Sequence, residues 1–321
     1  MNEKLKTIFQ DRFKENEPLA KHTTWRIGGP AKWFVEARNS DEVKTAVSLA
    51  TEAGINWFVL GGGSNVLVND DGFAGLVIQL ALRDIRVEGN KITVSVGVPA
   101  VLLARTAAEA GLSGLEWMAT LPGTVGGAVR GNAGCFGSET KDRLVSATIL
   151  RDGAIVEVLK NDLSFDYRHS IFKKNKEIIL AAVFELLPGD PEIIKSKMAE
   201  FLAKRLATQP PAGGTTGCVF KNYKIKDNEL DRLKQEIDIV GANGCSPINN
   251  GIIPAGWLIE QMDLKGKKIG GAKVSEKHAN FIENVDGATA SDVVQLIALI
   301  KMNARDRFGI QLEEEVEYLG F

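Results

Sequence analysis

The chain has no excess of either charge and no long apolar run, and each absence excludes a class of protein. It contains 39 basic and 41 acidic residues, a formal net charge of -2, whereas a nucleic-acid-binding domain usually has a basic excess or a basic stripe. No stretch approaches the roughly 18 consecutive apolar residues that a membrane-spanning helix needs. We therefore expect neither nucleic acid nor a membrane among its partners.

Cysteine and histidine are scarce as well. The 3 cysteines, Cys135, Cys218 and Cys245, are an odd number without paired or metal-type spacing. The 3 histidines cannot form a metal site on spacing grounds, so no metal is predicted. The N-terminus has no apolar core after Lys4 and Lys6, which argues against a signal peptide and favours a cytoplasmic protein.

What is present is the composition of a globular protein. The 321 residues are 44% hydrophobic and 25% charged, and that length predicts two or three domains. Periodicity and end signals predict strands within 31–37, 57–60, 66–68, 147–158, 178–187 and 310–319. They predict helices through Leu5, Ile8, Phe9 and Phe13, from Asp41 to Glu52 after a Ser40 cap, at 101–110 and 191–207, and from a Ser291 cap to Gly309.

A glycine turn at residues 61–65 joins two of these strands. A P-loop or a Rossmann turn needs a helix directly after its glycines, so neither motif is present. Consecutive glycines can instead form a nest of backbone N–H groups around a phosphate, because no Cβ hinders a close approach. The glycines alone leave both a phosphate nest and a plain hairpin turn open.

A second glycine-rich segment follows at residues 111–137, which hold 8 of the 33 glycines (positions 111, 114, 123, 126, 127, 131, 134 and 137). Glycine inside an ordered segment costs roughly 0.5–1 kcal/mol relative to alanine. A fold keeps it where backbone must touch backbone or a ligand. Loops at 61–65 and 122–127 would fit the two ends of one long phosphate-bearing cofactor.

Seven segments in this order resemble the UDP-N-acetylenolpyruvoylglucosamine reductase family, also called UDP-N-acetylmuramate dehydrogenase. The segments are residues 23–29, 61–65, 121–128, 167–172, 217–222, 255–260 and the closing 312–316. The resemblance implies an FAD-binding fold of the vanillyl-alcohol-oxidase type over residues 1–200, in two α+β subdomains split near 80–90. A smaller α+β substrate-binding domain would occupy residues 201–321.

The family reduces the enolpyruvyl ether of UDP-N-acetylglucosamine to the lactyl ether, in peptidoglycan precursor synthesis. The resemblance therefore implies non-covalent FAD, NADPH as co-substrate and a nucleotide-sugar substrate. The short C-terminal domain indicates the family's shorter type, and we expect a monomer. The residues that the resemblance assigns to FAD are Gly61, Gly62, Gly63, Ser64, Asn65, Pro122, Gly123, Thr124, Gly126, Gly127, Asn132 and Gly134.

The reaction needs a cation or donor for the developing enolate and an acid that protonates the carbanion. Arg168 is the candidate for the first task, because its fork fits a carboxylate. Its residue type alone equally allows an ordinary salt bridge.

Glu315 matches the second glutamate of the family's closing motif, where it would donate a hydrogen bond only if its surroundings keep it protonated. Strand periodicity places Glu313 on the same face as Glu315 and turns Glu314 inward. A bulge would change that alternation, so Glu313 stays an alternative to Glu315.

Cys218 occupies the family's proton-donor position, and a thiol is a stronger acid than an alcohol. A small buried hydrophobe is the other interpretation of a lone cysteine. Lys221, Asn222 and His278 match substrate-side positions, although a lone loop histidine can equally be structural. Tyr223 stands where the family usually has proline.

Two rival functions are open. Another flavin oxidoreductase of this fold could bind FAD covalently, and Cys135, otherwise interpreted as a packing residue like Cys245, is the one candidate attachment point. A catalytically silent nucleotide-sugar sensor is the second rival, which the presence of Arg168, Cys218 and Glu315 argues against.

Overall fold

The computed structural model describes residues 1–211, 213–226, 228–229, 233, 248 and 250–321, so Cys245 lies outside the described residues. The chain divides into two compact units, each with its own core. Unit 1 comprises Met1–Glu17, Pro30–Gly63 and Phe73–Ala207, and unit 2 comprises Pro18–Gly29, Ser64–Gly72 and Thr208–Phe321. The predicted domain limits, 1–200 and 201–321, stay predictions.

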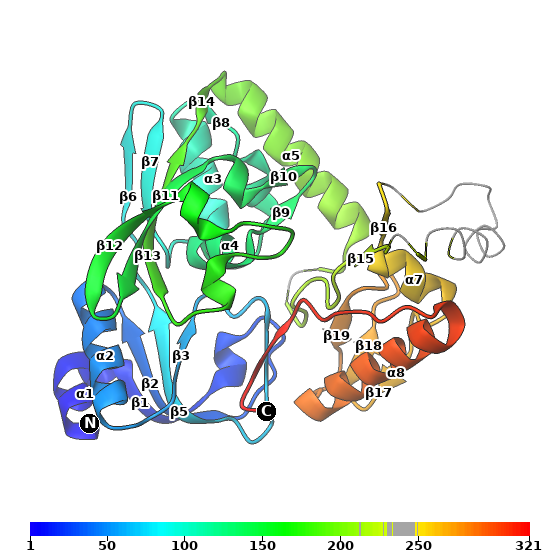
Figure 1. Ribbon diagram of the computed structural model, residues 1–321, viewed down its shortest axis with the longest axis horizontal. Coiled ribbons are helices and arrows are strands. Elements are labelled where there is room, and N and C mark those ends of the chain that lie inside the picture. The colour runs from blue at the N-terminus through cyan, green and yellow to red at the C-terminus, as the bar shows by residue number, and fades with distance from the viewer. Residues whose placement is uncertain (212, 227, 230–232, 234–247, 249) are drawn as a thin grey trace. The chain divides into compact units, whose positions relative to one another are not determined.

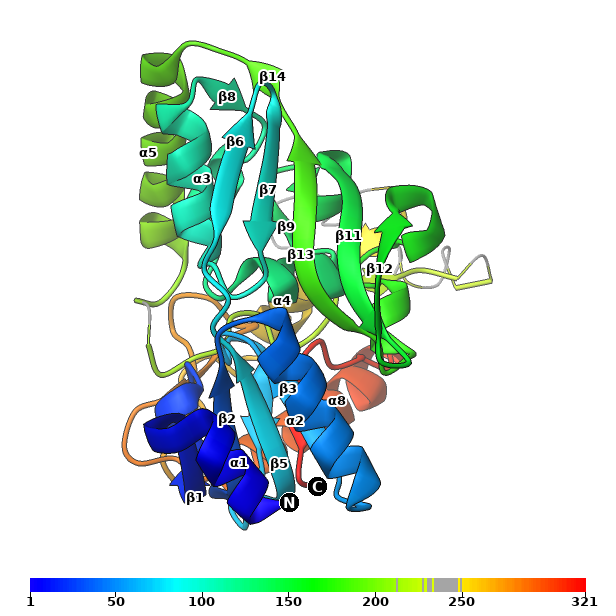
Figure 2. The same cartoon turned by 90° about the vertical axis from the view of Figure 1, so that its left-hand side faces the viewer.

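The first sheet of unit 1 has the strand order β1-β2-β5-β3, with β5 parallel to both of its neighbours. Its strands are β1 (Phe13–Pro18), β2 (Pro30–Ala37), β3 (Trp57–Leu60) and β5 (Phe73–Leu80). Its helices are α1 (Asn2–Phe9) and α2 (Ser40–Glu52). Figure 2 shows α2 lying across one face of this sheet, where it buries Val43, Ala46 and Ala50 at helical spacing.

The second sheet of unit 1 is antiparallel, with the order β12-β11-β13-β7-β6. Its strands are β6 (Ile85–Glu88), β7 (Lys91–Ser95), β11 (Leu144–Arg151), β12 (Ala154–Leu159) and β13 (Ile178–Glu185). Two short pairs accompany it: β8 (Leu112–Ser113) with β14 (Leu187–Pro188), and β9 (Gly134–Cys135) with β10 (Ser138–Glu139). The helices are α3 (Ala100–Glu109), α4 (Val125–Gly131), which packs on β13, and the long α5 (Pro191–Thr208) (Figure 1).

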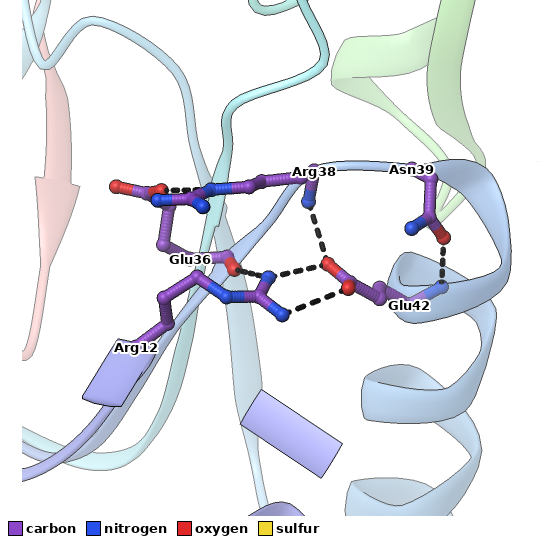
Figure 3. A network of polar contacts seen from close by, with 5 residues as sticks. All are labelled: Arg12, Glu36, Arg38, Asn39 and Glu42. Carbon is purple, nitrogen blue, oxygen red and sulfur yellow. Dashed lines mark hydrogen bonds and ion pairs between the residues drawn. The ribbon is translucent and has the colours of Figure 1, made fainter. Parts of the chain in front are cut away.

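A polar network ties the start of unit 1 to α2 (Figure 3). Arg12 donates two hydrogen bonds to the carboxylate of Glu42, at 2.6 and 2.9 Å, and one to the carbonyl of Glu36 at 2.8 Å. Asn39, rather than the predicted Ser40, caps α2, since its side chain accepts from the backbone N–H of Glu42 at 2.9 Å. The Arg12 hydrogen bond lowers the pKa of Glu42.

Unit 2 combines short strands with α-helices, and residues from both form its core. Its strands are β4 (Val66–Val68), β15 (Tyr223–Lys224), β16 (Ile252–Ile253), β17 (Lys268–Ile269), β18 (Ala272–Val274), β19 (Ile282–Asn284) and β20 (Glu317–Leu319). Its α-helices within the described residues are α7 (Ala255–Gln261) and α8 (Ala290–Phe308), of which α8 packs on β17 and β18 (Figure 1). No helix among the described residues is long and apolar enough to cross a membrane.

Several predicted element limits are wrong in informative ways. Phe13 begins β1 rather than continuing the first helix, because α1 ends at Phe9. Thr289, not Ser291, caps α8 in a reciprocal capping box with Asp292. The predicted strand at 310–319 is regular only over β20, where it pairs in parallel with β4.

The interpretation of residues 61–65 as a plain hairpin is also wrong. β3 before the turn pairs with β5, whereas β4 after it pairs with β20, so the flanking strands do not pair with each other. The second glycine segment is not all loop, because α4 begins at Val125 directly after Thr124.

Candidate functional site

In unit 1 the first glycine turn packs tightly against the second glycine segment. A Cβ on Gly62 would lie 2.8 Å from the Cα of Gly123, and one on Gly61 would lie 2.8 Å from Thr124 Oγ1. Gly63 and Gly123 adopt positive φ angles of 60° and 97°, a region that favours glycine. The predicted cofactor residues 61–63 and 123–124 therefore come together, backbone against backbone. The expectation that these loops hold the two separate ends of a long cofactor is wrong, because they form one place.

The hydroxyl of Thr124 marks this place as a ligand cradle. Thr124 Oγ1 is shielded from solvent and has no hydrogen-bond partner within the described part of the chain. A buried hydroxyl without a partner costs free energy, so most such groups in native proteins are satisfied. A phosphate oxygen would accept from this hydroxyl, so the cradle fits the pyrophosphate of FAD.

The other predicted cofactor positions of unit 1 have different surroundings. Pro122 and Gly127 are exposed beside the cradle, whereas a Cβ on Gly126 would lie 2.8 Å from the Cβ of Val96, so packing alone requires that glycine. Asn132 is fully buried at the left-handed end of α4. Its amide donates to a carboxylate oxygen of Glu139 at 3.0 Å and to the carbonyl of Asp166 at 2.9 Å, which is a structural use of the side chain.

Arg168 lies in unit 1 at a strained position. It belongs to a tight turn in which Asp166 and His169 exchange backbone hydrogen bonds of 3.1 and 3.0 Å. Its φ of 53° is in the left-handed region, which is unfavourable for a residue with a side chain. Its guanidinium donates to the carbonyl of Gly134 at 2.9 Å and lies 5.1 Å from the ring centroid of Tyr167. The turn thus presents the predicted electrophile beside a predicted cofactor residue.

In unit 2 the segments that carry Cys218 and Glu315 lie side by side. The N–H of Glu315 donates to the carbonyl of Val219 at 2.8 Å, and the N–H of Lys221 donates to the carbonyl of Glu313 at 2.9 Å. On its other edge the Cys218 segment forms an antiparallel bridge with Phe281. The predicted proton donor and the predicted carboxylate therefore come from adjacent, hydrogen-bonded segments.

The three consecutive glutamates have separate surroundings. Glu313 forms an ion pair with Lys221 at 3.2 Å, and its side chain is 74% exposed. Glu314 pairs with Lys301 of α8 at 2.8 Å, and its side chain is only 23% exposed. Glu315 is half-buried, and its own N–H makes the hydrogen bond to the Cys218 segment at Val219. These positions favour Glu315 over Glu313 as the candidate carboxylate.

The second half of the first glycine turn, Ser64 and Asn65, belongs to unit 2. There it is hydrogen-bonded to the backbone of Glu315. Asn65 donates from its side-chain amide to the carbonyl of Glu315 at 2.9 Å and accepts from the N–H of Glu317 at 3.0 Å. Ser64 is half-buried next to it. Asn65, predicted to bind FAD, thus also fixes the backbone of the candidate carboxylate.

The predicted substrate-side residues are arranged around the same segments of unit 2. Asn222 accepts from the N–H of Ala255, the first residue of α7, at 3.1 Å. His278 packs on Phe281, with ring centroids 4.7 Å apart, and burial lowers its pKa. Its Nδ1 accepts from the N–H of Asn280 at 3.3 Å, so the neutral ring carries its proton on Nε2.

Two residues that the sequence patterns did not single out border Cys218. Asn280 is 3% exposed and pairs with the backbone of Phe220. Thr216 is 6% exposed, and its hydroxyl has no hydrogen-bond partner among the described residues. The available signal for Asn280 was an amide isolated in the apolar run 279–282, whereas Thr216 had none beyond its closeness to Cys218 in the sequence.

Cys135 has the surroundings of a packing residue. Its sulfur lies 3.8 Å from both Thr120 Oγ1 and the carbonyl oxygen of Trp117, and burial raises the pKa of its thiol. A thiol with a raised pKa is a poor nucleophile, which argues against covalent flavin attachment. No group of His, Cys, Asp and Glu side chains suitable for a metal ion occurs within the described residues.

Comparison with known proteins also assigns the glycine cradle and the Cys218 segment to two different domain families. Residues 31–159 match the FAD binding domain family, so the glycine cradle belongs to an FAD-dependent oxidoreductase. Residues 209–319 match the family of UDP-N-acetylenolpyruvoylglucosamine reductase C-terminal domains.

Full-length relatives define the class further. The UDP-N-acetylenolpyruvoylglucosamine reductase of Carboxydothermus hydrogenoformans is 41% identical over 95% of this chain and 93% of its own length. That of Bacillus subtilis is 40% identical over the same shares. The crystal structure of the Thermus caldophilus reductase matches 96% of this chain and 98% of its own, with a TM-score of 0.76 and 32% identity. The chain belongs to the UDP-N-acetylenolpyruvoylglucosamine reductase family, which confirms the predicted family, its α+β fold and its FAD cofactor.

Proposed function

We propose that this protein reduces the enolpyruvyl ether of UDP-N-acetylglucosamine to UDP-N-acetylmuramate, with NADPH as the source of hydride. The product is a precursor of peptidoglycan, so the proposal extends to roles in cell-wall synthesis, cell shape and division. We also propose that the enzyme works in the cytoplasm as a monomer.

One observation carries this proposal beyond family membership. The Cys218 segment is hydrogen-bonded to the Glu315 segment through Val219, so the thiol and the carboxylate are carried by paired backbones. Reduction of an enol ether requires an acid for the carbanion and a second polar group beside it. This pairing supports proton delivery by Cys218, with Glu315 donating a hydrogen bond in its protonated form.

Each residue would have a separate task. Bound FAD, cradled by residues 61–63 and 123–124, supplies hydride chemistry. The guanidinium of Arg168 would stabilise the negative charge that develops on the substrate carboxylate, since its fork matches that group. Lys221, Asn222 and His278, the last through Nε2–H, would orient the nucleotide sugar.

The direct test is anaerobic. The purified protein should show a flavin band near about 450 nm that NADPH bleaches without substrate. Addition of the enolpyruvyl nucleotide should restore the band and give a product heavier by one hydride and one proton. Bleaching without restoration would favour another flavin oxidoreductase, and absence of both would favour a silent sensor.

A further inference from the structure

Asn280 makes three hydrogen bonds to the segment that follows Cys218, two through its side-chain amide and one through its backbone carbonyl. Its Nδ2 donates to the carbonyl of Phe220 at 2.8 Å, and its Oδ1 accepts from the N–H of Phe220 at 3.0 Å. Its own carbonyl accepts from the N–H of Val219 at 2.8 Å. One residue therefore holds the three successive peptide groups that follow Cys218.

The local fold explains why a side-chain amide is used here. Residues 278–281 form a turn, in which the N–H of Phe281 donates to the carbonyl of His278 at 3.0 Å. A turn cannot continue a strand ladder beside the 218–221 segment. The side-chain amide of Asn280 turns one N–H donor and its carbonyl oxygen toward Phe220 in a single plane, as a peptide group would, and so supplies the missing pair.

The Glu315 segment holds the other edge of the Cys218 segment. The carbonyl of Val219 accepts from the N–H of Glu315, so the Cys218 segment is held between Asn280 and the Glu315 segment. Asn280 is 3% exposed, so its hydrogen bonds to Phe220 are shielded from bulk water. The N–H of Asn280 also donates to His278 Nδ1, which links the same residue to the substrate side.

We propose that Asn280 is a positioning residue for proton delivery, because it sets the backbone from which the Cys218 thiol faces the substrate. This inference rests on the proposed function and adds to it a residue that touches no substrate. A displaced thiol would still be present and acidic, but it would reach the carbanion at the wrong distance and angle. A displacement of about 1 Å can cost on the order of 10²-fold in rate.

The test compares Asn280→Asp with a matched control, Asn284→Asp. Aspartate keeps the size of asparagine and the acceptor for Phe220 N–H, but replaces the donor with an oxygen that faces the Phe220 carbonyl. Asn284 is also tied to backbone, donating to the carbonyl of Trp25 at 3.0 Å and accepting from the N–H of Ala288 at 2.8 Å. The control therefore loses one equivalent bond without a contact to residues 218–221.

The readouts separate positioning from stability. Both variants should bind FAD and be reduced by NADPH within about threefold of the parent rate. After prereduction, Asn280→Asp should return hydride to the enolpyruvyl nucleotide on the order of 10- to 10²-fold more slowly, and Asn284→Asp within about threefold. In D2O, NMR of the product should show a mixed configuration at the protonated carbon for Asn280→Asp and a single one for the parent and control.

Equal slowing in the two aspartate variants, with one product configuration, would overturn the proposal. If Asn280→Asp fails to hold FAD, Asn280→Gln takes its place, since it keeps the amide but shifts it by one methylene. If neither Asn280 variant is reduced by NADPH, Asn280 serves folding alone and the proposal is wrong. A parent protein that never oxidises its flavin with the nucleotide would instead contradict the proposed function.

Discussion

The two units present their candidate residues by different means. In unit 1 the cradle is made of backbone: Gly61 and Gly62 pack on the second glycine segment, and the hydroxyl of Thr124 has no hydrogen-bond partner among the residues that the structure describes. In unit 2 the candidate residues lie on irregular segments held by side-chain amides, Asn65 on one side and Asn280 on the other. The first arrangement suits a large cofactor with phosphates, and the second suits exact placement of an acid.

This difference predicts different consequences of mutation. A changed cradle in unit 1 should remove FAD and with it every reaction. A substitution in unit 2, at Cys218 or at the asparagine that holds its segment, Asn280, should leave FAD bound and reducible. It should impair only the step that involves substrate.

The largest effect is expected at Cys218 in unit 2. Cys218→Ala should lower turnover on the order of 10²–10⁴-fold, the range for a positioned general acid, while reduction of the flavin by NADPH stays nearly normal. Cys218→Ser should recover much of the activity because a hydroxyl occupies the same place. Rapid-mixing absorbance of each half-reaction measures both effects.

Cys135→Ala is the control for that experiment, because Cys135 packs in unit 1 and should tolerate the change with little loss of rate. A Cys218→Ala enzyme with near-normal turnover and a lowered melting temperature would make Cys218 a packing residue.

Next in size is Gly62→Val in unit 1. The new Cβ would lie 2.8 Å from the Cα of Gly123, so the two glycine segments must separate and the cradle should lose most of its FAD. The ratio of flavin to protein absorbance measures the loss. Gly131→Val is the matched control, because a Cβ there meets no atom within 4 Å. Normal flavin content in Gly62→Val would contradict the cradle.

A smaller effect is expected for Thr124→Val, which removes the hydroxyl and keeps the shape. A lost hydrogen bond of about 1–2 kcal/mol corresponds to FAD binding weakened on the order of 5- to 30-fold. The melting temperature of the FAD-free protein should not fall, because the hydroxyl has no partner among the described residues.

Thr140→Val provides the contrast. Its hydroxyl donates to the carbonyl of Ala133 at 2.9 Å, so that variant should lose stability and keep its affinity for FAD. If both threonine variants behaved alike in a flavin titration, the Thr124 hydroxyl would have no special role.

The smallest effect concerns pH and the fold of unit 1. Arg12 lowers the pKa of Glu42 below its unfolded value of about 4.3. The ion pair therefore stabilises the fold above that value, and the stabilisation is lost as pH falls through the folded-state pKa. Glu42→Gln should cost about 1–3 kcal/mol at pH 7, and parent and variant should converge under acid conditions in urea unfolding curves.

Asp292 allows the same comparison in unit 2. Its pKa is lowered by the backbone N–H of Thr289, so Asp292→Asn should cost about 1 kcal/mol as a weakened cap, with the same direction of pH dependence.

For the Arg12–Glu42 ion pair, the contradicting result would be a loss of unfolding free energy in Glu42→Gln that grows as the pH falls.

The sequence predicted only part of the regular structure of unit 1: strands within 31–37, 57–60, 147–158 and 178–187 were identified, whereas β1, β5, β6 and β7 were missed. Strand 57–60 was identified from its apolar run, and the helix that ends at Glu52 buries Val43, Ala46 and Ala50 along one face. Helix caps were less predictable: Asn39 and Ser40, or Thr289 and Ser291, are all good cap residues, and which one caps depends on where the preceding strand or turn ends.

The site was predictable where residue type decides the chemistry and not where tertiary contacts do. The glycines of residues 61–65 were identified as a place of close approach, but their partner, Gly123, is known only from the fold. Strict alternation left Glu313 and Glu315 equivalent, and the irregular backbone before β20 separated them by pairing Glu313 with Lys221. Asn280 was missed because its role depends on a turn that no local pattern predicts.

The most direct test of the proposed mechanism is to measure the two half-reactions of Arg168→Ala anaerobically by rapid mixing. Reduction of the flavin by NADPH should stay close to the parent rate, because no enolate forms in that step. Oxidation of the reduced flavin by the enolpyruvyl nucleotide should slow on the order of 10²–10³-fold, as expected for a lost charge stabiliser. Equal slowing of both half-reactions would contradict the account, since Arg168 would then position the flavin instead of stabilising the enolate.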